Sequence, residues 1–287
     1  MVDAIQQSGG DGTGGPPNSG DKPRLLVVSV GHTNATASLT RGATLDKPRR
    51  FPLDDLGAVA DGLVEMAGEL AAEGADDAAV VFSWTNRAAC DTLASALAGR
   101  TELRTFRLME DLTIPIRHAL QDEAVAKTGQ DRLLNALAAF DAAKQAVVVV
   151  DAGTAITVDF IDGKGVFQGG AIAPGAGAGL RALHSMTTSL PELKAEQPDD
   201  EPFGRDTRQA MLQGMKYGAQ GLVRRLVERY AEAYDAYPMV VATGGDAGLL
   251  FDDDELVDRV VPHLTLRGIA LACVHELGED GGAGGTA

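Results

Sequence analysis

Buried strands and amphipathic helices alternate along most of this chain. Short β-branched apolar runs predict buried strands at 24–30, 78–84, 146–150 and 237–245. Segments of alternating polarity predict returning strands at ATASLTRG, after a turn at Gly31–Asn34, then at AITVDFI and, after the turn DGKG, at VFQGGAIAPG. Apolar residues at helical spacing predict helices over 53–70, 88–99, 131–145, 176–189, 205–233 and 264–277. This order predicts an α/β protein with mixed sheets, and it excludes an all-helical bundle and a β-sandwich.

Two parts of the chain resemble each other. RLLVV-SVGHT and AVVVV-DAGTA each consist of an apolar strand, a polar residue, a glycine turn and the start of a returning strand. The repeat favours two similar lobes, which we place at 23–145 and 146–277, although so short a match leaves a duplication open. Residues 1–22 and 278–287 are rich in Gly, Ser, Asp and Pro, and we expect both to be disordered tails.

The composition argues against some classes of binding partner. The chain has 287 residues, with 25 Lys and Arg against 41 Asp and Glu, a net charge of −16. So acidic a chain is not expected to bind nucleic acid or an anionic membrane surface. Its two cysteines form no CxxC motif, and no apolar run approaches the roughly 20 residues of a membrane span, so we expect a reduced, cytoplasmic protein.

Three glycine- and threonine-containing turns each follow a buried strand, at Gly31–Thr33, Gly153–Thr154 and Thr243–Gly245. Such turns can direct backbone N–H groups and hydroxyls toward phosphate oxygens, and a carboxylate at a strand end, such as Asp151, can hold a cation beside them. Taken singly, each turn also fits a plain hairpin. The P-loop pattern, zinc-ligand spacing and the GxSxG elbow are absent from the sequence, and PGAGAGL lacks the third glycine of a dinucleotide fingerprint.

Asp131 and Arg132 open a predicted helix directly after Gly129. An acidic residue there can serve the helix dipole alone, or it can act as a general base beside a cationic anchor. The local pattern does not decide between the two roles. Asp159 is a further candidate to approach a magnesium ion, although we expect this outward-facing strand residue to be exposed.

With these motifs in order, residues 24–277 resemble the type III pantothenate kinases, which belong to the acetate-kinase, sugar-kinase, heat-shock-protein and actin superfamily. The family's DxGNTN, GxDR and DxGTAxT motifs are similar to SVGHTN at 29–34, GQDR at 129–132 and DAGTAIT at 151–157. Further matches follow at GGAIAPG (169–175), SLP (189–191), GRDT with AMLQG (204–214), TGG (243–245) and LTLRG (264–268).

The resemblance implies two ribonuclease-H-like lobes with a nucleotide cleft between them, and ATP-dependent phosphorylation of pantothenate, the first step towards coenzyme A. It implies that Asp131 accepts the proton of the substrate hydroxyl, and that Asp151 binds a monovalent cation, potassium or ammonium, while Mg²⁺ accompanies ATP. Members are commonly homodimers with the substrate pocket near the interface. The implied pantothenate-binding residues are Gly129, Gln130, Asp131, Arg132 and Thr207, and the implied ATP-binding residues are Ser29, Val30, Gly31, His32, Thr33, Asn34 and Thr154.

Two departures from the family pattern keep alternatives open. Ser29 stands where the family has the first-motif Asp, and His32 stands where it has Asn. Ser29 retains a hydroxyl but lacks the negative charge, which predicts weaker metal affinity. The alternatives are therefore a catalytically weak or inactive homologue that binds nucleotide or a protein partner, and a kinase for another small hydroxylated substrate.

Overall fold

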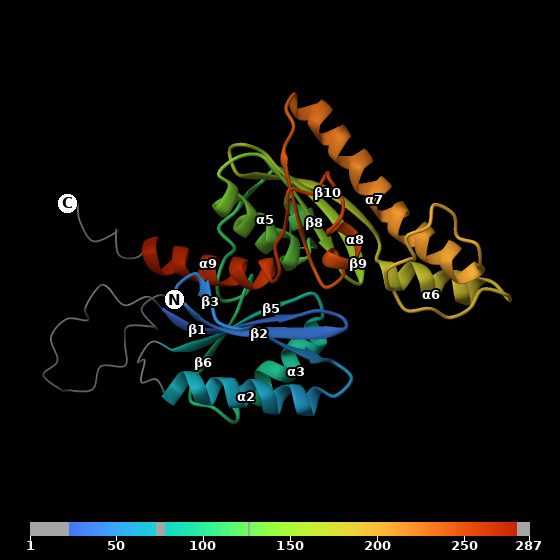
Figure 1. The fold of residues 1–287 in the computed structure, drawn as a ribbon. Coiled ribbons are helices and arrows are strands. Elements are labelled where there is room, and N and C mark those ends of the chain that lie inside the picture. The colour runs from blue at the N-terminus through green and yellow to red at the C-terminus, as the bar shows by residue number, and fades with distance from the viewer. Residues whose placement is uncertain (1–22, 73–77, 126, 280–287) are drawn as a thin grey trace, which may run out of the picture. The chain divides into compact units, whose positions relative to one another are not determined.

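The computed structural model describes residues 23–72, 78–125 and 127–279. The chain divides into two compact units. Unit 1 ends at Pro115 and takes up the chain again from Leu266, and unit 2 is Ile116–Thr265. Each unit contains one mixed β-sheet with helices packed on it (Figure 1).

The sheet of unit 1 has the strand order β3-β2-β1-β5-β6, and β4 pairs with β2. Strands β1 and β2 are antiparallel, whereas β5 and β6 continue the sheet in parallel with β1. The strands are β1 (Arg24–Val30), β2 (Asn34–Arg41), β3 (Thr44–Leu45), β4 (Arg49–Pro52), β5 (Ala79–Trp84) and β6 (Arg104–Arg107).

Helices α2 (Leu56–Ala72) and α3 (Arg87–Ala98) cover one face of this sheet (Figure 1). Alternate residues of β1, Leu26, Val28 and Val30, belong to the hydrophobic cluster that these helices complete. Asn86 begins α3 by accepting a hydrogen bond from the backbone N–H of Ala89, which satisfies a free donor of the first turn.

The sheet of unit 2 has the strand order β12-β11-β8-β9-β10-β7, in which the path β10-β9-β8-β11-β12 repeats the path β3-β2-β1-β5-β6 and β7 adds a parallel edge strand. Strands β8, β9 and β10 form an antiparallel meander, and β11 and β12 extend the sheet in parallel with β8. The strands are β7 (Arg117–His118), β8 (Val147–Ala152), β9 (Ala155–Ile161), β10 (Val166–Pro174), β11 (Met239–Thr243) and β12 (Arg259–Val260). The shared order confirms the predicted α/β fold and gives the short sequence repeat a structural counterpart.

Helices cover both faces of the unit 2 sheet. Val148 and Val150 of β8 share a hydrophobic cluster with Val223 and Val227 of α7 (Thr207–Tyr234), whereas α5 (Gln130–Ala143) packs against β8 and β9. Because side chains alternate along a strand, residues with the parity of Asp151 lie on the α5 face. The remaining helices are α4 (Asp122–Val125), α6 (Ala176–Met186), α8 (Ala247–Phe251) and α9 (Leu264–Glu279).

The unit boundaries differ from the predicted lobes at two places. Helix α5, which we assigned to the lobe 23–145, belongs to unit 2, and most of α9, assigned to the lobe 146–277, belongs to unit 1. The hydrophobic pattern identifies the apolar face of each helix, but it does not identify the sheet that this face covers.

Several shorter elements also differ from the sequence analysis. Strands β3, β4, β6, β7 and β12 and helices α4 and α8 were not predicted, because they are too short for a clear periodicity. The predicted tail 1–22 lies outside the described residues, as does 280–287, whereas Gly278 and Glu279 are the last residues of α9. Within the described ranges, no helix is long and apolar enough to span a membrane.

Candidate active site

Asp131 and Arg132 lie in the first turn of α5, which begins after Gly129. The Oδ1 atom of Asp131 accepts a hydrogen bond from the backbone N–H of Arg132 at 2.9 Å. The positive end of the helix dipole favours a carboxylate in this turn. The structure therefore fixes the Asp131 carboxylate at the start of α5, with the Arg132 guanidinium on the neighbouring residue.

Asp151 lies near the end of β8 and is held by a hydrogen-bond chain from two other elements. The side-chain amide of Asn135, one turn after Asp131 in α5, donates to Oδ2 of Asp151 at 2.8 Å. The hydroxyl of Thr265, near the start of α9, donates to Oδ1 of Asn135 at 2.9 Å. Asn135 is 2 % exposed, so its amide forms hydrogen bonds inside the protein and not with solvent. An amide on the otherwise apolar face of α5 is a signal that the sequence analysis missed.

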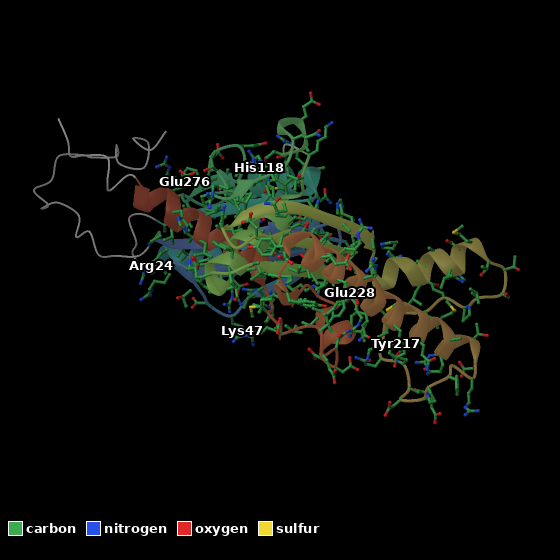
Figure 2. All side chains as sticks on the ribbon, turned by 90° about the horizontal axis from the view of Figure 1, so that it is seen from above. Arg24, Lys47, His118, Tyr217, Glu228 and Glu276 are labelled. Atoms are coloured by element: carbon green, nitrogen blue, oxygen red, sulfur yellow. The ribbon has the colours of Figure 1, made fainter. Side chains whose placement is uncertain are left out.

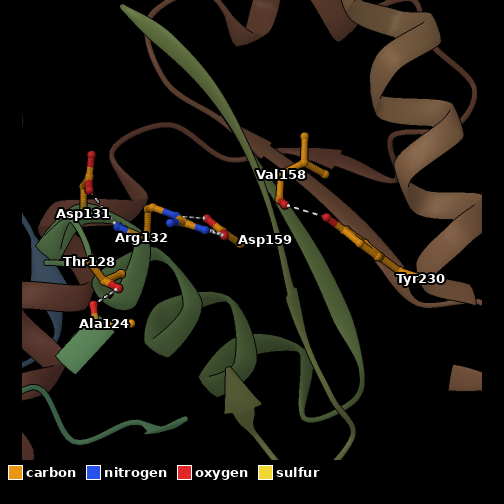
Figure 3. Close-up of polar contacts among 7 residues, drawn as sticks. All are labelled: Ala124, Thr128, Asp131, Arg132, Val158, Asp159 and Tyr230. Atoms are coloured by element: carbon orange, nitrogen blue, oxygen red, sulfur yellow. Dashed lines mark hydrogen bonds and ion pairs between the residues drawn. The ribbon is translucent and has the colours of Figure 1, made fainter. Parts of the chain in front are cut away.

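Asp159 is buried, which corrects the expectation that it is exposed. It has the strand parity predicted to face away from the α7 core, but α5 covers that face. Its two carboxylate oxygens each accept a hydrogen bond from Nε of Arg132 at 3.0 Å, and Nη2 of Arg132 also binds Oδ1. Figure 3 shows this ion pair between α5 and β9, with Tyr230 donating to the backbone carbonyl of Val158 from the other side of the strand.

Burial raises the pKa of all three carboxylates, and negative charge from a neighbouring carboxylate adds to the rise at Asp131 and Asp151. Loss of hydration is the largest cause of the raised pKa of Asp131, and the negative charge of Asp159 adds to it, against the N–H and guanidinium of Arg132. Burial, together with the charges of Asp131 and Asp159, raises the pKa of Asp151 to about 6. Since Arg132 is the cation that pairs with this group among the described residues, negative charge is in excess here.

Two of the three predicted phosphate-binding turns lie together in unit 2. Thr243 of β11 pairs with Asp151 of β8, so the turn after β11 lies beside the turn after β8. Gly244 has a φ of 98°, and a Cβ at this position would lie 2.5 Å from Oδ1 of Asp151. The backbone of the Thr243–Gly245 turn therefore packs directly against the Asp151 carboxylate.

The third turn belongs to unit 1. The backbone N–H of Gly31 donates to the carbonyl of Asn34 at 2.9 Å, which closes the turn between β1 and β2. Ser29 pairs with Thr36 and with Ser83 in the sheet registers, so hydroxyl residues surround the position where the family has a carboxylate. Val30 is buried in the strand, while His32 and Thr33 are exposed in the turn.

Thr207 is not brought near α5 within the chain. It is the exposed first residue of α7, and Asp206 caps that helix by accepting from the N–H of Gln209 at 2.7 Å. The first turn of α7 lies beside α6, at the end of unit 2 away from α5 (Figure 1). Thr154, by contrast, lies exposed in the turn directly after Asp151 and Gly153.

No cluster of three or more His, Cys, Asp or Glu residues that could hold a metal occurs in the described part of the chain. Asp151 is nevertheless a partly buried carboxylate with an amide partner and no cationic partner among the described side chains. Its chemistry fits a weakly bound cation that completes its coordination with ligand oxygens or water. The arrangement as a whole can accept a proton at Asp131, bind an anion at Arg132 and hold a cation at Asp151.

Comparison with known proteins identifies the family of this chain. The family model of type III pantothenate kinase matches residues 25–229. The chain belongs to the type III pantothenate kinase family. A relative of that name from Syntrophotalea carbinolica is 32% identical over 268 residues, which cover 88% of this chain and 100% of the relative. The match to the type III pantothenate kinase of Desulfatibacillum aliphaticivorans is 37% identical, but it spans 56% of this chain and 61% of that protein.

Solved structures share the fold of this family member at low sequence identity. A Baf family transcriptional activator from Campylobacter jejuni has a TM-score of 0.55 at 21% identity, covering 89% of this chain and 100% of that one. An activator of 2-hydroxyisocaproyl-CoA dehydratase from Clostridium difficile, solved with bound ADPNP, has a TM-score of 0.53 at 12% identity, covering 92% and 99%. Both support the two-lobed α/β architecture of this pantothenate kinase family member.

Proposed function

We propose that this protein transfers the γ-phosphoryl group of ATP to the hydroxyl of pantothenate, which is the first step towards coenzyme A. The observation on which the proposal depends is the Asp131 carboxylate in the first turn of α5, next to Arg132 and electrostatically coupled to Asp151, in a chain of the type III pantothenate kinase family. Use of ATP follows from membership of a kinase family.

Asp131 is the proposed proton acceptor for the attacking hydroxyl. Burial and the neighbouring negative charge raise its pKa, which makes its ionised form a better base than an exposed aspartate. Phosphoryl transfer depends mainly on positioning and on neutralising charge on the phosphate oxygens. Gly129, Gln130 and Arg132, which adjoin Asp131 in the chain, are the proposed substrate-binding residues.

The proposed nucleotide contacts come from two segments, the turn at Ser29–Asn34 and Thr154. Asp151 is the proposed ligand of a monovalent cation, K⁺ or NH₄⁺, and the excess of negative charge around it supports this assignment. Bound there, the cation would supply positive charge next to the phosphates, and Mg²⁺ would do the same on the nucleotide.

Thr207 supports the proposal of a homodimer. Thr207, a proposed pantothenate-binding residue, is exposed at the start of α7, at the end of unit 2 away from α5, and in the proposed dimer a second copy of the chain brings it to Asp131. Exposed apolar side chains accompany it, with Met186 at 84%, Phe203 at 70% and Tyr217 at 56%. Tyr217 lies on α7 toward the end beside α6 (Figure 2). A cytoplasmic homodimer is the proposed form of the enzyme.

The test is a phosphorylation assay on purified protein with ATP, Mg²⁺, K⁺ and pantothenate, in parallel with Asp131→Asn. Formation of 4′-phosphopantothenate by the wild type well above the variant supports the proposal, and equal product from the two contradicts it. A panel of other small alcohols under the same conditions tests the alternative acceptors.

Two further experiments test the proposed cation at Asp151 and the effect of Ser29 in the first motif. Replacing K⁺ with Na⁺ should lower turnover, and indifference would count against the Asp151 assignment. If the wild type is inactive but Ser29→Asp is active, the protein is the weak homologue that the sequence allowed. Activity in the wild type removes that alternative.

A further inference from the structure

Arg132 is held on one edge only. Asp159 occupies Nε and one N–H of Nη2, and the Phe167 ring lies 5.6 Å from the guanidinium carbon. Within the described residues, the hydrogen bonds of the Arg132 side chain all go from Nε and Nη2 to Asp159 and none comes from Nη1, and this side chain is 15% exposed. Since a guanidinium has five N–H donors in a rigid plane, fixing one edge also fixes the direction of the other edge.

The backbone of β10 is shaped around the Asp159 carboxylate. Asp159 pairs with Gly170 in the sheet register, and a Cβ at Gly170 would overlap Oδ1 of Asp159 and the carbonyl of Val158. Directly before this pair the register shifts between Phe167 and Gly169, and Gly169 has a φ of 102°. The bulge and the glycine together leave space for the carboxylate to turn toward α5.

We propose that Asp159 is a positioning residue that fixes the Arg132 guanidinium so that its free edge presents donors to acceptor oxygens of the substrate beside Asp131. The inference rests on the proposed function for the identity of the substrate. Asp159 itself touches no reacting atom, and its carboxylate neutralises part of the Arg132 charge while leaving Nη1 available.

The test is a kinetic comparison of four folded enzymes: wild type, Asp159→Asn, Arg132→Lys and the double variant. We expect Asp159→Asn to raise the KM for pantothenate by about ten-fold or more while the KM for ATP changes by less than about two-fold. The double variant should lose no more than Arg132→Lys alone, because Asp159 acts through Arg132. Wild-type KM values in Asp159→Asn, or additive losses in the double variant, would overturn the inference.

Asp254→Asn is the matched control for stability. Asp254 is a partly buried aspartate of unit 2, with its side chain 5% exposed and an arginine partner, Arg224. The Asp254→Asn substitution should lower the melting temperature but leave the KM for pantothenate unchanged. If Asp159→Asn fails to fold because Arg132 is left unpaired, Asp159→Glu keeps the charge and displaces the contact by one methylene. A folded Asp159→Glu enzyme with wild-type KM would also overturn the positioning role.

A readout without catalysis separates this inference from the proposed function. The exchange rate of the Arg132 Nε–H proton, followed by ¹⁵N NMR and assigned with Arg132→Lys, should rise by about ten-fold or more in Asp159→Asn. If the wild type phosphorylates no pantothenate but this rate rises, the proposed function fails and the fixing of Arg132 by Asp159 stands. An unchanged rate contradicts the positioning role whatever the activity.

Discussion

Asn135 donates a hydrogen bond from Nδ2 to Oδ2 of Asp151 at 2.8 Å, across the interface between α5 and β8. The same amide accepts from Thr265, so one buried side chain connects α5, β8 and the start of α9. Among the described contacts, this hydrogen bond is what opposes the rise in the pKa of Asp151. It thereby favours the ionised carboxylate that a cation needs.

Replacing Asn135 with Ala should weaken the cation site and destabilise the fold. The change leaves the Thr265 hydroxyl and the Asp151 carboxylate without their buried partner, at a cost of about 1–3 kcal/mol. Thermal melts and a K⁺ titration of activity measure the two effects. Thr265→Val is the control, because it removes only the hydrogen bond from Thr265 to Asn135 and leaves the one from Asn135 to Asp151 in place. An Asn135→Ala enzyme with the wild-type K⁺ dependence would contradict the proposed role of Asp151.

Asp131→Asn should lose activity without losing stability. Removing a general base costs about 10²–10⁴-fold in kcat. Because burial disfavours the ionised form of Asp131, a neutral amide of the same shape avoids that cost, and the variant should melt at or above the wild-type temperature at neutral pH. Paired kcat and melting measurements check this. A variant that is both inactive and much less stable would indicate a structural role.

The raised pKa of Asp151 predicts a stability that falls with pH in potassium-free buffer. Its pKa is about 6 in the folded protein against 3.8 for an unperturbed carboxyl, so the folded state binds this proton more tightly. The stabilisation from this group is present below the lower value and is lost as the pH rises through about 6. Asp151→Asn should therefore gain in melting temperature relative to wild type between about pH 4 and about pH 7.

Melting curves of both proteins across this pH range measure the difference. Added K⁺ should reduce the difference near neutral pH, because it stabilises the ionised carboxylate of the wild type alone. Parallel curves with no divergence would contradict the buried environment of Asp151.

Gly244→Ala should disturb the Asp151 carboxylate from the turn after β11, whereas Asn135 contacts it from α5. The position combines a φ of 98° with a Cβ that would lie 2.5 Å from Asp151 Oδ1, so the substitution is strained and displaces the carboxylate. We expect a loss of more than about 1 kcal/mol in stability and a weaker K⁺ response. Gly221→Ala is the control, because nothing lies within 4 Å of its Cβ and the α7 helix gains about 1 kcal/mol. Equal melting temperatures for the two variants would contradict this account.

The sequence by itself determined the longer elements and supplied the candidate residues of the site. Runs such as RLLVVSV and AVVVV predict their strands because a strand buried on both faces must be apolar throughout. The motifs singled out Asp131, Arg132 and Asp151 as candidates, because turn glycines and helix-start carboxylates leave a local signature, and their role in the site stays a prediction. The pairing of Thr243 with Asp151, which brings the Gly153 and Thr243 turns side by side in unit 2, was not predicted from the sequence.

Only the tertiary structure decided what covers each face. Strand alternation placed Asp159 away from the α7 core, but the burial of that second face by α5 depends on long-range packing that no local pattern encodes. Asn135 looks locally like a polar interruption of an apolar helix face, and it gains its role only because β8 and α9 bring Asp151 and Thr265 to it. The hydrophobic periodicity of a segment predicts which of its faces is buried, but the residues that pack on that face depend on the three-dimensional fold.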